Sequence, residues 1–418
     1  MSSSSPAAGP SPEGLGPVRV LLPSIAAVNA VMFAAFGALT AVILPARVET
    51  IDPTGKVDSL AMILAVSAGF TLLAQPLVGA LSDQTRSRFG RRLPWVAGGS
   101  LVGGAFLIAF AGFDTVVWLA VGWTVIQFAL NGVDVALTAN VVDRFPAPRR
   151  GRAFGVIGAA AIGGGALGTL LAGFAPERHA ILGLVLGLLV IAVAAVFAIV
   201  NREPSSIGRE RRRLAFPAFL RGFWLNPRRS PAFAWMFASR FVFILGTQSI
   251  FSYLLYILID HLRLDRGAAA GLVGVSVAVG AAAMFAAIAL VGWLSDRVAR
   301  RVPFLLAACG LNAVGAVLML VAPSIAMVIA YAVLHGVGAG VYLVVGITLT
   351  SEVIPDPAGA AGKNLGVYNV ATNAAQIVAP ILAAVVIGSF GGYPLLFGVA
   401  LVLVVVAALL VLPLRRTH

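Results

Sequence analysis

Hydrophobic residues follow one another in long uninterrupted runs along this chain. Residues 181–200 and 398–413 contain no charged side chain, and comparable runs recur throughout. About 20 apolar residues form a helix that can cross ~30 Å of hydrocarbon. The polar breaks between the runs predict twelve membrane-spanning helices, at 20–44, 59–81, 95–113, 115–140, 154–174, 180–200, 232–259, 267–291, 303–321, 324–350, 365–388 and 392–414.

Composition indicates that the solvent of this fold is lipid. The 418 residues are 60% hydrophobic and 11% charged, whereas soluble domains carry about 25% charged residues. The one cysteine, Cys309, lies inside an apolar run, which excludes a disulfide framework and a cysteine-based metal site. We therefore expect an all-α membrane protein without a metal or another cofactor.

The net charge of +13 is distributed in short loops, so it does not indicate nucleic-acid binding. With the N-terminus inside, 23 of the 29 Lys and Arg residues fall on the cytoplasmic side, 5 fall outside and Arg240 lies within a helix. The positive-inside rule then places both termini in the cytoplasm, and we expect the protein in the cell membrane. The expected division is a disordered tail at 1–19, a helix bundle at 20–200, a cytoplasmic linker at 201–231 and a second bundle at 232–418.

The two bundles repeat each other at matching places. The sequence GALSD at 79–83 recurs as GWLSD at 292–296, and FPAP at 145–148 recurs as IPDP at 354–357. Pro146 and Pro355 are 209 residues apart, which is half the chain. Such a duplicated six-helix unit is typical of transporters that alternate access around a site near the membrane midplane.

Residues 79–94, GALSDQTRSRFGRRLP, resemble the signature loop between helices 2 and 3 of the major facilitator superfamily. Four additional residues separate Asp83 from the Gly-Arg-Arg at 90–92, and this longer spacing resembles the glycoside/pentoside/hexuronide and sucrose/proton symporters. The resemblance implies a transporter built of two six-helix bundles, with a substrate path enclosed by helices 1, 4, 7 and 10.

The loop also suggests a cytoplasmic gate, because a carboxylate at the membrane edge can pair with nearby guanidinium groups. The predicted gate residues are Gly79, Asp83, Gly90, Arg91 and Arg92, with Asp296, Arg300 and Arg301 as their counterparts in the second half. For Arg86 and Arg88 the alternative, that they only set topology, is preferred.

The fourth predicted helix carries a polar face. Thr124, Gln127, Asn131, Asp134 and Thr138 are spaced 3, 4, 3 and 4 residues apart, so they project from one side. Asp134 is either the carrier of a proton or cation, or half of a permanent ion pair with Arg240 or with the loop arginines. A face with this many polar groups predicts a cavity wall.

Other helices carry polar and aromatic residues that complete the predicted binding site. These are Asn29, Phe33, Arg240, Gln248, Tyr253, Tyr256, Tyr331, His335, Asn373 and Gln376. His335 is either a proton relay or substrate donor, or a histidine with its hydrogen bonds satisfied that packs against Tyr331.

These patterns predict a secondary transporter of a small polar, sugar-like solute, coupled to protons. Melibiose-type symporters carry acidic residues in helices 1 and 2, and the absence of such residues here makes sodium less favoured. Proton-coupled export of amphipathic compounds is the alternative. The chain has no phosphate-binding loop and no His-Glu-x-x-His motif, so an enzyme is not expected. We expect a monomer whose linker binds anionic lipid through residues 214–224, although a plain linker remains the alternative.

Overall fold

The computed structural model describes residues 18–208, 230–295, 297, 301–353, 361–389 and 392–416. All regular secondary structure in these ranges is helical, and they contain twelve helices that are long and apolar enough to cross a membrane. The predicted tail, residues 214–224 of the linker, Asp296 and Arg300 lie outside the described ranges, except for the last residues of the tail at 18 and 19.

The N-terminal half contains the first six of the twelve membrane-crossing helices. Its elements are α1 (Val18–Ala38), the π turn η1 (Leu39–Ile43), α2 (Leu44–Ile51), α3 (Lys56–Gln84), α4 (Leu93–Ala109), α5 (Val116–Arg144), α6 (Ala147–Phe174) and α7 (His179–Val200). The first helix was predicted to end at residue 44, and it continues through the π turn to Ile51. Pro45 lies in the first turn of α2, where a missing N–H is tolerated, so this proline does not end the helix.

The C-terminal half repeats this organisation. Its elements are α9 (Pro231–Ser252), α10 (Leu254–Tyr256), the π turn η4 (Ile257–His261), α11 (Arg266–Ser295), α12 (Val302–Val321), α13 (Ile325–Val353), α14 (Ala361–Ser389) and α15 (Tyr393–Val411). The helix predicted at 232–259 is divided, because α9 ends at Ser252 and a short helix and a π turn follow it.

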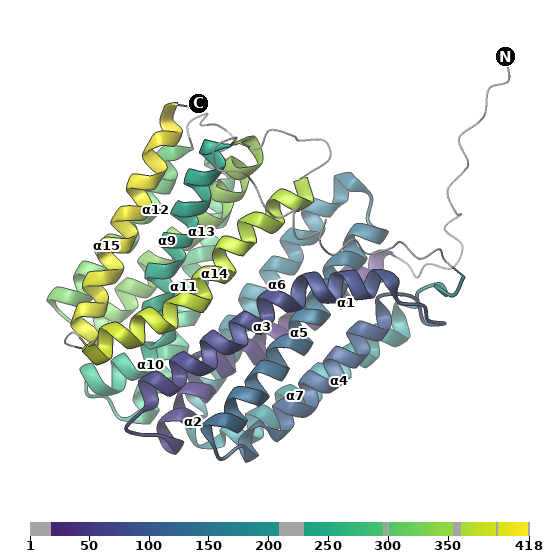
Figure 1. The fold of residues 1–418 in the computed structure, drawn as a ribbon, viewed down its shortest axis with the longest axis horizontal. Coiled ribbons are helices and arrows are strands. Elements are labelled where there is room, and N and C mark those ends of the chain that lie inside the picture. The colour runs from purple at the N-terminus through teal and green to yellow at the C-terminus, as the bar shows by residue number, and fades with distance from the viewer. Residues whose placement is uncertain are drawn as a thin grey trace.

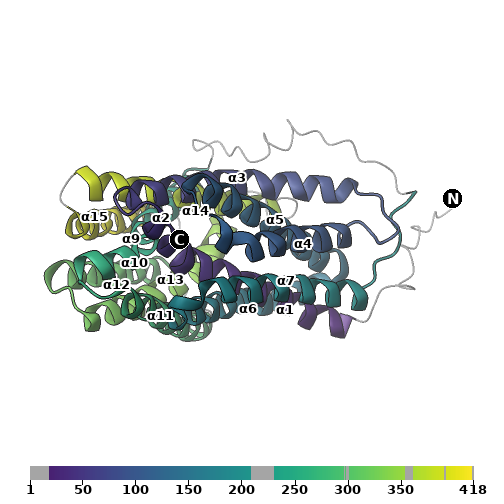
Figure 2. The ribbon, with the colours of Figure 1, turned by 90° about the horizontal axis from the view of Figure 1, so that it is seen from below.

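Helix packing shows the duplication predicted from the sequence. In the first half α1 packs on α6, α3 on α5 and α4 on α7; in the second half the corresponding pairs are α9 with α14, α11 with α13 and α12 with α15. The halves meet along two helix pairs, α3 with α14 and α6 with α11, on opposite sides of the molecule (Figure 2). The fold is therefore two six-helix bundles.

Small residues allow some of these helices to touch through their backbones. A Cβ added to Gly164 or Gly168 would collide with the carbonyl groups of Ala30 and Ala34 in α1. The backbones of α6 and α1 are therefore in close contact at these positions. At Gly79, by contrast, a Cβ would only reach an ordinary contact of 3.7 Å with Val135.

The two ends of the molecule differ (Figure 1). At the end that carries α2 and α10, called the closed end below, the halves touch. Here the Tyr256 hydroxyl donates to the Pro45 carbonyl at 2.9 Å, and the Tyr253 hydroxyl donates to that of Val57 at 3.0 Å. Towards the opposite end, called the basic end, the two halves diverge in Figure 1.

Candidate functional site

A cavity region between the two halves consists of two adjoining lobes. Phe33, Phe36, Thr40, Gln248 and Gln376 line both lobes, so these side chains form the wall that the lobes share. One lobe has a volume of about 230 Å³ and the other of about 440 Å³. These sizes suit small molecules, whose sites usually measure about 300 to 1,000 Å³.

The smaller lobe, called the amide lobe, lies between α1, α3, α5, α9 and α14. Its polar lining consists of carboxamide and hydroxyl side chains: Thr40, Ser67, Thr71, Gln75, Gln127, Asn131, Gln248, Ser252, Asn373 and Gln376. Each carboxamide offers both donors and an acceptor. Among the described residues, no Asp, Glu, Lys or Arg lines this lobe, so its lining suits hydrogen bonds to an uncharged molecule.

The larger lobe, called the apolar lobe, lies between α1, α6, α9, α11 and α13. Aromatic and aliphatic side chains form most of its wall, including Phe33, Phe251, Val277, Met284 and Tyr331. The Phe33 and Phe36 rings meet edge to face with centroids 5.6 Å apart. This lining excludes water and favours a flat apolar group.

His335 is the polar group that α13 contributes to the apolar lobe. Its ring stacks on Tyr331 with centroids 5.9 Å apart, and its Nδ1 lies 2.8 Å from Oδ1 of Asn312 on α12. Asn312 donates its amide to the Ala308 carbonyl at 2.9 Å, so its oxygen faces the histidine and Nδ1 must be the donor. In the neutral ring Nε2 is then an acceptor. The interpretation of His335 as a hydrogen-bonded residue against Tyr331 agrees with this geometry, and the same side chain lines the cavity.

Eight of the thirteen residues predicted to bind substrate or cation line the two lobes. They are Phe33, Gln127, Asn131, Gln248, Tyr331, His335, Asn373 and Gln376. The other five lie elsewhere. Asn29 is buried in α1 and donates to the Ile25 carbonyl at 3.2 Å, while Tyr253 and Tyr256 hold the closed end through hydrogen bonds to backbone carbonyls.

Asp134 and Arg240 belong to different halves and do not pair with each other. Arg240 donates to the Thr372 hydroxyl at 3.0 Å, and its guanidinium lies 5.9 Å from the centroid of the Tyr342 ring. Asp134 lies one turn beyond Asn131 on α5 and makes no hydrogen bond or ion pair with any residue that the structure describes. The predicted alternative of a permanent ion pair is therefore absent from this structure.

The predicted gate at the basic end is a charge cluster within the N-terminal half. Arg92 binds Asp83 and lies 3.3 Å from Asp143, and Arg91 lies 2.7 Å from Asp143 and 3.8 Å from Asp83. Glu203, which follows α7, accepts from the Arg92 backbone N–H at 3.0 Å. Asp83 contacts both arginines within one half, and the gating role of this cluster stays a prediction.

Gly90 supplies the conformation that this cluster needs. Its φ of +90° lies in the left-handed region, which glycine adopts without strain. A Cβ here would also collide with the Glu203 side chain. Among the gate residues predicted in the second half, Arg301 immediately precedes α12 and lies at the basic end.

A second charge cluster, called the clamp, joins the halves at the closed end. Lys56 at the start of α3 lies 2.8 Å from Glu49 of its own half and 2.8 Å from Asp260 of the other half. Tyr393 donates to Asp260 at 2.6 Å, and Arg266 lies 3.4 Å from Glu49. The Glu49 and Lys56 side chains are only 7% and 13% exposed, so water screens their interaction weakly.

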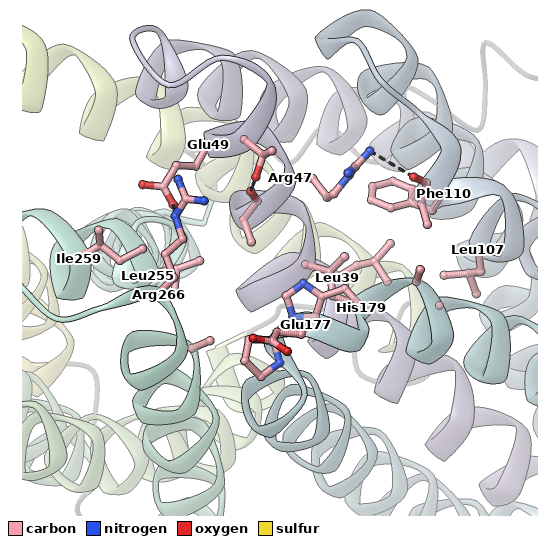
Figure 3. A pocket seen from close by; sticks show the side chains of 18 residues that line it. Leu39, Arg47, Glu49, Leu107, Phe110, Glu177, His179, Leu255, Ile259 and Arg266 are labelled. Atoms are coloured by element: carbon pink, nitrogen blue, oxygen red, sulfur yellow. Dashed lines mark hydrogen bonds and ion pairs between the residues drawn. The ribbon is translucent and has the colours of Figure 1, made fainter.

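A separate cavity of about 330 Å³ lies beside the clamp and is lined by both halves (Figure 3). Glu49 and Arg266 lie together on one side of it. On the other side Arg47 donates to the carbonyls of Ala111 at 3.1 Å and Phe113 at 2.7 Å. These bonds tie α2 to the segment that follows α4 within the N-terminal half.

The sequence did not predict that α3 lines the amide lobe. It also did not predict the further acidic residues that contact Arg91 and Arg92 at the basic end. Ser67, Thr71 and Gln75 line the amide lobe at spacings of four residues, a periodicity that would have identified a polar helix face. Asp143 and Glu203 carried no comparable signal, because their arginine partners are 51 and 111 residues away in the chain.

Comparison with known proteins agrees with this architecture. The family model described as Major Facilitator Superfamily matches residues 25–291 and 249–418. A bacterial homologue of the human lysosomal transporter Spinster, crystallised in an inward-facing and unoccupied conformation, covers 96% of this chain and 97% of its own, with a TM-score of 0.68 and 16% identity. The nucleoside transporter NupG covers 95% of this chain and 98% of its own, with a TM-score of 0.71 and 12% identity.

One curated relative, an uncharacterized symporter of Synechocystis sp. (strain ATCC 27184 / PCC 6803 / Kazusa), is 46% identical over 57 residues. That match spans 14% of this chain and 9% of the relative's length. At these identities the two solved structures show a shared fold.

Proposed function

Because the chain belongs to the Major Facilitator Superfamily, we propose that it is a proton-coupled secondary transporter that moves a small, uncharged, sugar-like solute by alternating access. The observation that supports this most directly is the central cavity, which lies between two halves that the clamp joins at one end. A transporter of this kind exposes one site to each side in turn. Parting the clamp while the basic end closes would expose the same site to the other side.

The amide lobe supports a sugar-like solute. A sugar presents many hydroxyl groups, each of which donates and accepts, and carboxamides match that pattern better than charged groups do. The lobe offers six carboxamides, at Gln75, Gln127, Asn131, Gln248, Asn373 and Gln376. Phe33 and Phe36 add flat surfaces against which a sugar ring can pack.

The basic end would face the cytoplasm of the cell, since arginine-rich loops are retained there. The loop at 85–92 carries four arginines at this end. Both termini would then be cytoplasmic, and the protein would lie in the cell membrane as a monomer in contact with lipid.

Asp134 is the proposed carrier of the proton. A carboxylate inside a membrane span is costly unless it is paired or protonated, and Asp134 has no pairing partner among the described residues. It lies one turn from Asn131, which lines the amide lobe. A solute bound to that amide would therefore sense its charge, and the effect must be reciprocal.

Proteoliposomes with an imposed pH gradient and a panel of labelled sugars test this proposal. The protein should accumulate at least one sugar only with the gradient. Asp134→Asn should abolish pH-driven accumulation while sugar exchange across the membrane continues, because exchange needs no net proton movement. Thr138→Val, a change one turn further along the same helix, is the matched control and should keep accumulation. Full pH-driven uptake by Asp134→Asn would overturn this assignment of the proton carrier.

A second candidate is proton-coupled export of amphipathic compounds, which the size and lining of the apolar lobe favour. A strain lacking the protein would then become sensitive to toxic amphipathic compounds. Under the first proposal the strain would instead lose growth on a sugar.

A further inference from the structure

The adjacency of the two lobes carries an inference about the solute, and it rests on the transport of a sugar-like solute proposed above. A free sugar would fill only the amide lobe, whose volume is about 230 Å³. The apolar lobe, at about 440 Å³, is the larger of the two, and Phe33, Phe36 and Gln248 line both lobes. A molecule bound in the amide lobe therefore lies against side chains that also line the apolar lobe.

The apolar lobe is more than hydrophobic space, because it presents two unused polar atoms. Ser276 is only 4% exposed, and its hydroxyl has no hydrogen-bond partner among the described residues. Nε2 of His335 likewise has no partner in the described part of the chain, while Asn312 holds Nδ1 as a donor. Both side chains line the lobe. A buried polar group without a partner is costly, so the Ser276 hydroxyl indicates that a ligand supplies the missing bond. Nε2 of His335, in the same lobe, can accept a second bond from that ligand.

The surfaces around these atoms are flat and aromatic. The His335 and Tyr331 rings are stacked at an interplanar angle of 13°, and Phe33, Phe36 and small residues of α6 also line the lobe. No charged side chain in the described part of the chain lines either lobe. An aromatic ring fits such a slot, and an acceptor in neutral histidine requires a donor from that ring.

We infer that the transported solute joins a polyhydroxylated part, held in the amide lobe, to an aromatic ring that carries an N–H or O–H donor, held in the apolar lobe by stacking and by a hydrogen bond to His335. Aryl glycosides and nucleosides both have this chemistry. The ring adds buried apolar area, which should tighten binding by about tenfold or more over the same sugar with a methyl group.

Binding to the purified protein, measured by thermal stabilisation and by competition in proteoliposomes, tests the inference with matched probes. The first pair is methyl and 4-hydroxyphenyl β-D-glucopyranoside; the second is methyl β-D-ribofuranoside and adenosine. At least one aromatic probe should bind about tenfold more tightly than its methyl partner. Phenyl β-D-glucopyranoside, which lacks the donor, should bind more weakly than its hydroxyphenyl analogue.

Two variants locate the effect. Ala281→Leu fills the apolar lobe from α11 and should remove the aromatic advantage, so that each aromatic probe binds no more tightly than its methyl partner. Ala282→Leu makes the same change at the neighbouring exposed residue and should have no effect. His335→Phe keeps the stacked ring and removes the acceptor, so it should abolish the difference between the phenyl and hydroxyphenyl glucosides. Because this readout is a ratio measured on one variant, a loss of stability does not affect it.

The outcomes separate this inference from the proposed function. Equal binding of methyl and aromatic probes in both pairs would overturn the inference and leave sugar transport intact. An aromatic preference that persists in Ala281→Leu would also overturn it, since the ring would then bind elsewhere. Failure of every probe to bind would overturn both.

Discussion

Replacing Asp260 by asparagine tests whether the clamp holds the closed end. Asp260 is the residue of the C-terminal half that accepts from Lys56, at 2.8 Å. The change keeps the size of the side chain and removes its charge. Lys56 retains Glu49 at 2.8 Å, so no buried cation is left alone and the loss is confined to the contact between the halves.

The size of the effect follows from the geometry of this pair. A hydrogen bond between charged groups contributes about 1.5 to 3 kcal/mol. The Asp260 side chain is 32% exposed, so solvent screening places this contact near the lower value, about 1.5 kcal/mol. The contact exists only while the closed end is closed. Its loss should therefore shift the equilibrium about tenfold towards the state that is open at this end.

Distances between spin labels report this equilibrium. Labels on Thr54→Cys and Ala322→Cys, two exposed positions in loops of opposite halves, with Cys309 replaced by alanine, should show a larger population of long distances in Asp260→Asn. Asp52→Asn is the matched control, because Asp52 lies at the same end and its carboxylate accepts from the Ser59 hydroxyl and the Gly55 N–H of its own half. A distance distribution in Asp260→Asn that matches the control would refute a holding role for the Lys56 contact.

Further predictions concern the basic end and the helix contacts. Asp83→Asn should slow transport with little change in solute affinity, because the Arg92 contact lies outside both lobes; a large affinity loss at normal turnover would contradict this. Gly168→Ala should lower the free energy of unfolding by about 1 to 3 kcal/mol, because the Cβ of the new alanine would collide with the Ala34 carbonyl. The control Gly158→Ala, with no atom within 4 Å of the added Cβ, should be neutral or slightly stabilising; equal losses in both would argue against the α1 to α6 contact.

The helices were predictable because each must span hydrocarbon and therefore shows as an uninterrupted apolar run. The predicted ranges 303–321 and 392–414 differ by at most one residue from the observed spans Val302–Val321 and Tyr393–Leu414. The first helix was less predictable. A proline usually ends a helix. The residues around Pro45 contain no pattern that predicts a π turn followed by a further helix.

The site was predictable where polar residues recur along one helix and unpredictable where they meet across the fold. Gln127 and Asn131 were identified by spacing alone, and both line the amide lobe. The clamp depends on contacts such as Lys56 with Asp260, which are 204 residues apart. From the sequence, Lys56 could be assigned only to the non-cytoplasmic side of the membrane. Its contact with Asp260 leaves no local sequence pattern, because the two residues are far apart in the chain.

The clamp also determines how its opening would respond to the membrane potential. Of its four charged groups, Glu49 and Lys56 move with the first half, and Asp260 and Arg266 move with the second. Each half thus carries one negative and one positive charge. Separating the halves moves no net charge through the field, and work against a membrane potential requires a net charge. Opening of the clamp should therefore be electrically silent, so any voltage dependence of transport would come from the coupling ion.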